Sequence, residues 1–161
     1  MTASTALWAR AGLSAVAIAT PLAVTIPAGP ASAVITNGPD AAAANWITYS
    51  IQADRAWVHE PGLYVSPALN QVAYQHAAQM VASHALFDSS NLAVDAGWAV
   101  PGWTRLGENS GYGPDAGSVA WAFVHSPSHL VNILGSYNEI GVAAVRSGST
   151  LWVTEVFAKR G

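Results

Sequence analysis

The clearest hydrophobic pattern in the chain has helical spacing. Between Ser66 and Ala85 one side of the predicted helix is formed by Leu69, Val72, Ala73, His76, Ala77 and Met80. Ser66 can accept a hydrogen bond from the first turn, and Pro67 suits the first helical position. The pattern therefore predicts a helix from Ser66 to about Ala85.

Three further helices are predicted from their start and stop signals. Asp40 can cap a helix that runs through four alanines toward Trp57, and the turn at residues 59–62 ends it. Another helix is expected over Ala116–Val124. A short fourth helix is bounded by a cap, a first-turn proline and a terminal glycine, at Ser126, Pro127 and Gly135.

Strands are expected mainly at the end of the chain. Glu139–Arg146 and Thr150–Phe157 are rich in β-formers and flank a hairpin turn at residues 147–149. Residues 88–113 are irregular and rich in Gly and Trp, with one short strand expected at Thr104–Gly107. Helices followed by an antiparallel hairpin predict an α+β domain in which helices cover the sheet.

Residues 1–33 have the features of a secretory signal peptide. Arg10 is their only charge, an apolar stretch follows it, and the segment ends in an Ala-x-Ala cleavage pattern at Ala33. The alternative is a retained anchor, but the apolar run is short for a membrane span and Pro21 interrupts it. Without a twin-arginine pair, we expect Sec-type export. The expected organisation is a signal peptide at 1–33, a short leader at 34–39 and one domain at 40–161, with no membrane span after cleavage.

Composition narrows the class of protein. Only 9% of the 161 residues are charged, and the net charge is -3. Nucleic-acid binding is not expected, because it needs clustered Lys and Arg. The chain has no Cys, which excludes disulfides, thiolate zinc sites and thiol nucleophiles.

Two histidines are candidates for chemistry, each with a structural alternative. His129 is expected near the N-terminus of the short helix, whose dipole disfavours imidazolium, so a neutral ring that binds metal or accepts a proton is predicted. The alternative is a His that only bonds a neighbouring loop. His76 lies in the apolar stripe, where a hydrogen-bonded core histidine is the common explanation. The spacing of His125 and His129 does not make a zinc motif, because Ser126-Pro127 interrupts the helix between them.

Two carboxylates stand out because charge is so sparse. Glu108 follows Gly107 in an irregular segment, and Glu155 alternates with apolar residues on a predicted strand. A buried carboxylate has a raised pKa and needs a partner. Either residue could instead be a structural hydrogen-bonding group. Ser126 is a helix cap without a nucleophile-elbow motif, so a serine hydrolase is not indicated.

Several ordered motifs resemble the CAP superfamily of cysteine-rich secretory proteins, antigen 5 and pathogenesis-related proteins. Residues 102–113 (GWTRLGENSGYG) are similar to its bacterial "GWxxxGENxGYG" stretch, and residues 126–134 (SPSHLVNIL) resemble its "SPxHxxNIL" helix. Residues 139–142 and 151–158 are similar to its closing strands, and residues 69–80 to its second helix. The resemblance covers Asp40–Ala158 and implies a three-layer α-β-α sandwich with a central antiparallel sheet.

The resemblance also implies a groove with two His and acidic residues that bind zinc. Glu108 matches the family Glu and His129 matches one family His. The second His belongs in an "FxHS" context, where this chain has Asp88 or Ser89. Since Asp can ligate zinc, Asp88, Glu108 and His129 are the expected metal ligands of a weakened site, with Glu155 and Asn109 also in the groove. The alternative is that the metal site has been lost.

The leading functional hypothesis is a secreted, non-enzymatic binding module that uses this groove to bind a lipid or a component of the cell envelope. The alternative is a metal-assisted, peptidase-like hydrolase with Glu108 as base and His129 as ligand. A third reading is a structural envelope protein with an inert groove.

Overall fold

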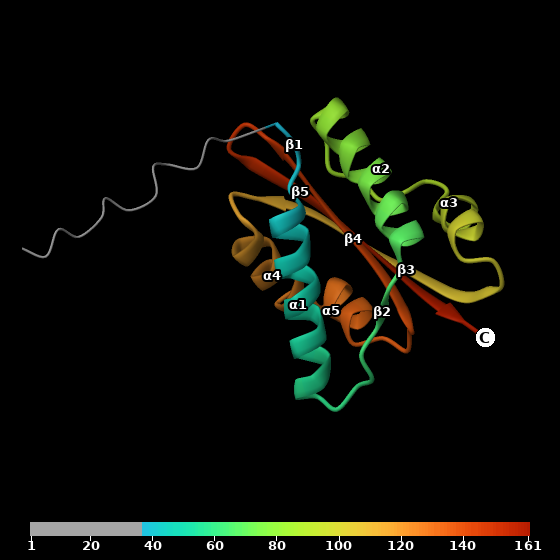
Figure 1. The fold of residues 1–161 in the computed structure, drawn as a ribbon. Coiled ribbons are helices and arrows are strands. Elements are labelled where there is room, and N and C mark those ends of the chain that lie inside the picture. Colours follow the sequence, from blue (N-terminus) through green and yellow to red (C-terminus); the bar gives the residue numbers. More distant parts are fainter. Residues whose placement is uncertain (1–36) are drawn as a thin grey trace, which may run out of the picture. The chain divides into compact units, whose positions relative to one another are not determined.

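The fold is known from a computed structural model that describes residues 37–161 (Figure 1). The predicted signal peptide, its cleavage site and leader residues 34–36 lie outside the described residues. Over residues 37–161, no helix is both long and apolar enough to cross a bilayer.

A five-stranded sheet forms the centre of the domain. Its longest hairpin joins β4 (Glu139–Ser147) to β5 (Thr150–Arg160), and β3 (Trp103–Gly113) pairs with the other side of β5. Two short strands, β1 (Gly38–Pro39) and β2 (Tyr64–Val65), both pair with β4. All pairings are antiparallel except that of β2 with β4, which is parallel.

Three helices cover one face of the sheet: α1 (Ala41–Trp57), α4 (Ala116–Val124) and α5 (Pro127–Ile133). Alternate residues of β4 and β5 face this layer, because side chains alternate between the two faces of a strand. The core between them contains Ile47, Ile51, Phe123, Ile133, Ile140, Val142, Leu151, Val153 and Phe157.

The opposite face is covered by α2 (Pro67–Ser83) and α3 (Leu92–Ala99), as Figure 1 shows. The intervening strand positions meet α2 there, including Ala143, Val156 and Ala158. Gly141 lets α2 approach closely, since a Cβ at this position would overlap the backbone of Leu69 and Asn70. Asn70 also accepts a bond from the Val142 amide at 2.9 Å. The three-layer α-β-α prediction is confirmed.

Most predicted elements are found with small shifts at their ends, but the region between α2 and α4 differs. The short strand expected at Thr104–Gly107 is the eleven-residue strand β3. Helix α3 was not predicted, because its eight residues include Gly97 and carry no side-chain capping bond. Gly38–Pro39, at the end of the predicted leader, pairs with β4 in the sheet.

Candidate functional site

Strand β3 divides the predicted site residues between the two faces of the sheet. Glu108 is in register with Val156, and Asn109 with Glu155. Val156 packs in the core beneath α2, so the pleat directs Glu108 toward α2 and Asn109 toward α5. The neighbouring motif residues Glu108 and Asn109 therefore take part in two different clusters.

The Glu108 carboxylate is held by a loop residue and a helix residue. The Ser89 amide donates to Oε1 at 2.7 Å and the Ser89 hydroxyl donates to Oε2 at 2.5 Å. His76 Nε2 lies 3.6 Å from Oε1, and the two side chains are only 4% and 6% exposed. Both carboxylate oxygens thus have partners although the group is almost fully buried.

Contacts with Phe87 and Glu108 fix the orientation of the His76 imidazole ring. Its Nε2 is 2.9 Å from the Phe87 carbonyl oxygen, and the Phe87 ring meets the imidazole edge-on at 5.1 Å. Since the Phe87 carbonyl and the Glu108 carboxylate are both acceptors, Nε2 must carry the hydrogen. The sequence analysis treated His76 as a hydrogen-bonded core residue, and it is one, but its partners belong to the Glu108 cluster.

A small polar pocket adjoins this cluster, and we call it the α2–α3 pocket. It has a volume of about 140 Å³ and is lined by Val72, Gln75, His76, Gln79, Phe87, Ser89, Ser90 and Asp95. Its residues come from α2, from α3 and from the loop between them. His76 and Ser89 therefore connect the pocket to the buried Glu108 carboxylate.

The second cluster lies on the α5 side of β3 and is centred on Asn109. Its amide nitrogen donates to Glu155 Oε2 at 2.8 Å and to the His129 carbonyl at 3.2 Å. Asn132 donates to Asn109 Oδ1 and to the Glu108 carbonyl, both at 2.9 Å. This network fastens α5 to the edge strand β3.

Glu155 is the most perturbed acid in the described part of the chain. Complete burial raises its pKa to about 8, the Asn109 bond opposes that shift, and the charge of Asp54 adds to it. Its Oε1 has no hydrogen-bond partner. At neutral pH the group is therefore largely protonated, which removes the cost of a buried charge.

His129 projects from α5 against Phe123, with ring centroids 4.7 Å apart. Burial lowers the pKa of His129, and the Asp88 carboxylate opposes this change. Its Nδ1 is buried without a partner. A neutral ring was predicted, and the lowered pKa agrees, but desolvation is the main cause rather than the helix dipole.

The expected zinc ligands are not assembled as a metal site. No hydrogen bond or ion pair joins the side chains of Glu108 and His129, and both Glu108 oxygens bond Ser89. Within residues 37–161, no group of three or more His, Cys, Asp or Glu side chains is placed to hold a metal ion. The donor arrangement does not fit zinc, and no chemical step is assigned to one.

Ser89 is a residue of the Glu108 cluster to which the sequence alone assigned no role. It stands where the family pattern places its second His, and it makes the two bonds to Glu108. The FxHS comparison named Asp88 or Ser89 at this place, so the signal was present. The choice between them needed the loop's conformation.

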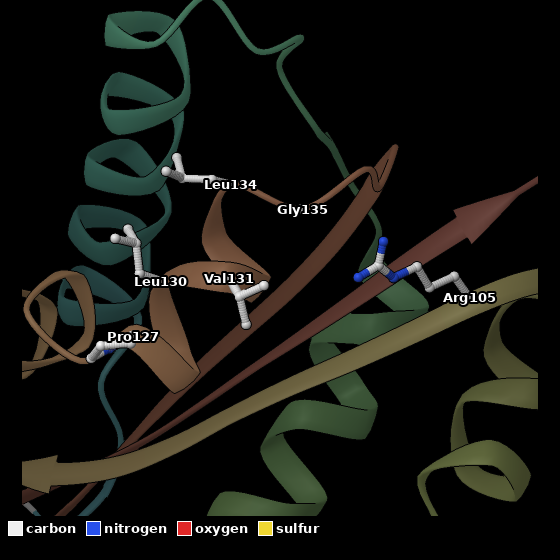
Figure 2. A pocket seen from close by; sticks show the side chains of 6 residues that line it. All are labelled: Arg105, Pro127, Leu130, Val131, Leu134 and Gly135. Atoms are coloured by element: carbon white, nitrogen blue, oxygen red, sulfur yellow. The ribbon is translucent and has the colours of Figure 1, made fainter.

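An apolar pocket of about 460 Å³ lies outside α5, away from the α2–α3 pocket (Figure 2). Its lining residues are Arg105, Pro127, Leu130, Val131, Leu134 and Gly135. The Arg105 guanidinium lies over the Tyr137 ring at 5.0 Å. Four of the six lining residues have apolar side chains, whereas the lining of the α2–α3 pocket is mostly polar.

The family comparison agrees with the motifs. The chain matches the model of the cysteine-rich secretory protein family, CAP, over residues 51–157. Because the match spans more than half of the chain, the protein belongs to the CAP family. No curated protein sequence matches it.

Three solved structures with the same fold come from bacterial proteins. An outer surface protein from Borrelia burgdorferi has 17% identity and a TM-score of 0.67, with 78% of this chain and 100% of that chain covered. An extracellular protein with an SCP domain from Bacillus anthracis has 19% identity and a TM-score of 0.64, with 75% and 41% covered. A cysteine-rich secretory protein from Staphylococcus aureus has 16% identity and a TM-score of 0.64, with 79% and 40% covered. The chain thus spans about two-fifths of the latter two proteins.

Proposed function

We propose that this protein is an extracellular binding module of the CAP family, exported by the predicted Sec-type signal peptide. Its α2–α3 pocket takes up a small polar group of a cell-envelope component. The observation that carries the proposal is the construction of the pocket wall. Ser89 and His76 line the pocket and are both held by the buried Glu108 carboxylate. Such a wall is pre-organised, which lowers the entropic cost of binding.

The metal-assisted hydrolase has less support. A general base needs a carboxylate within reach of a substrate proton or water, whereas both oxygens of Glu108 bond Ser89. His129 and Asn109 belong to the other cluster, beside α5. The Glu108/His129 groove of the initial hypothesis is therefore replaced in this proposal by the α2–α3 pocket.

The binding function is tested by obstructing the pocket. Ser90 is exposed and lines the pocket, so the larger side chain of Ser90→Phe fills the pocket from the outside. The matched control is Ser149→Phe, which changes an exposed serine in the β4–β5 turn. Isolated cell-envelope material is mixed with each protein and sedimented. We expect wild type and Ser149→Phe to co-sediment and Ser90→Phe to stay in solution.

Two results would contradict the proposed binding function. Equal sedimentation of all three proteins would remove the α2–α3 pocket from the function. Cleavage of a peptide library by wild type but not by Glu108→Gln would replace the binding module with the hydrolase. The intact mass of the exported protein tests the signal peptide, since cleavage after Ala33 leaves Val34 as the first residue.

A further inference from the structure

We infer that the α2–α3 pocket binds a protonated primary amine, carried either by a small molecule or by an amine-bearing side chain of a larger envelope component. The inference rests on the proposed function and adds the chemical class of the ligand. Charge, hydrogen-bonding capacity and size each support it.

The surroundings of the pocket carry acids and no strong bases. From residue 56 to residue 104 the chain contains neither Lys nor Arg, although it contains Glu60, Asp88 and Asp95. Asp95 lines the pocket, and the Glu108 carboxylate lies directly behind Ser89 and His76. A cleft lined by one sign of charge concentrates ions of the opposite sign, so this one favours a cation and disfavours a carboxylate or phosphate.

The lining offers acceptors that suit an ammonium group, which has three donors and no acceptor. Gln75 and Gln79 each carry a side-chain carbonyl, Ser90 a hydroxyl and Asp95 a carboxylate, and all four residues line the pocket. His76 directs its Nε2–H at the Phe87 carbonyl, so this donor is already used within the cluster. The Ser89 hydroxyl hydrogen is already used by Glu108, so Ser89 can only accept a further bond.

The volume limits what enters. A water molecule takes about 30 Å³ in the liquid, so a pocket of about 140 Å³ holds roughly five water-sized groups. An ammonium with a stem of three or four carbons fills that space. A long acyl chain does not fit, and a larger molecule can place only its end there.

The test is an NMR titration of the exported protein, labelled with nitrogen-15, at pH 7. The probes are n-butylamine, as a free small amine, and Nα-acetyl-lysine methylamide, as a side chain on a backbone. N-butylacetamide and the Nε-acetylated lysine compound are the neutral counterparts. We expect both amines to shift the backbone amides of Ser89 and Ser90, and the neutral compounds to bind at least fivefold more weakly. Binding of butylamine alone would support the inference and select a free amine as the source.

Asp95→Asn removes the exposed charge of the pocket, and Asp54→Asn on α1 removes a carboxylate from the other side of the sheet. We expect Asp95→Asn to weaken amine binding roughly fivefold to tenfold, as for a partly solvated charged hydrogen bond, and Asp54→Asn to leave it unchanged. Equal binding of amines and neutral compounds, or no shift at Ser89 and Ser90 with either amine, would overturn the inference. If Ser90→Phe still abolishes envelope binding in that case, the proposed function stands without the amine.

Discussion

At the scale of single residues, the site depends on how buried carboxylates are neutralised. Glu108 accepts two hydrogen bonds from Ser89, whereas Glu155 accepts one from Asn109 and has a pKa raised to about 8. The sequence pointed to both acids, because charges are so few and their neighbours so apolar. It could not predict their partners, since Ser89 reaches Glu108 through a loop conformation and His76 reaches it from another element.

Ser89→Ala is predicted to destabilise the fold. The substitution removes the hydroxyl donor to Glu108 Oε2 and leaves a buried carboxylate oxygen unpaired, which costs about 1 to 3 kcal/mol. Urea unfolding followed by tryptophan fluorescence measures the loss. Ser90→Ala is the control, since its hydroxyl is exposed, and equal stability of the two variants would contradict the role of Ser89.

The raised pKa of Glu155 predicts that the free energy of unfolding depends on pH. Its pKa is about 8 when folded, against an ordinary value of 4.5, so the folded state holds one more proton across that interval. Stability therefore falls as the pH rises from about 5 to 8, by at most about 4 to 5 kcal/mol if the full shift is realised.

The matched variant is Glu155→Gln, which keeps the shape but cannot ionise. We expect its unfolding free energy to exceed that of wild type at pH 8 and to converge with it near pH 5. Asp95→Asn should preserve the wild-type pH profile. If the gap between Glu155→Gln and wild type is the same at both pH values, Glu155 does not titrate as described.

At the scale of elements, helices with a strong local sequence pattern were predictable from the sequence. The secondary structure of the segment between α2 and α4 was not. Ser66 and Pro67 start α2 at the expected place. Strand β3 has three glycines, which disfavour a strand locally, but they are required by packing. A Cβ at Gly111 would meet the Phe123 ring, and one at Gly107 would meet Tyr137 and Asn132. Contacts with residues that are distant in sequence therefore stabilise β3 as a strand, against its local preference.

Gly141 in β4 is also required by packing, because α2 lies against it. Gly141→Ala would force α2 away from β4, because the added methyl group overlaps the backbone of Leu69 and Asn70. We expect a loss of at least about 2 to 3 kcal/mol, read as a lower thermal midpoint in circular dichroism. Gly117→Ala in α4 meets no backbone and should be neutral or stabilising by up to about 1 kcal/mol. Similar midpoints for the two variants would contradict the close approach of α2.

At the scale of the whole molecule, the fold and family were predictable while the arrangement of the site was not. Ordered motifs along the chain pointed to the CAP family, and the family match and the α-β-α sandwich confirm it. The motifs also suggested one groove for Glu108 and His129. The alternation along β3 directs Glu108 and Asn109 to opposite faces, so these two adjacent motif residues take part in different hydrogen-bonding clusters, which the motif alone does not reveal.

The central claim is that this CAP domain binds through the α2–α3 pocket. The most direct measurement is the co-sedimentation of wild type, Ser90→Phe and Ser149→Phe with isolated cell-envelope material, after circular dichroism shows that all three are folded. We expect that only Ser90→Phe remains in solution. Retention of Ser90→Phe at the wild-type level would contradict it.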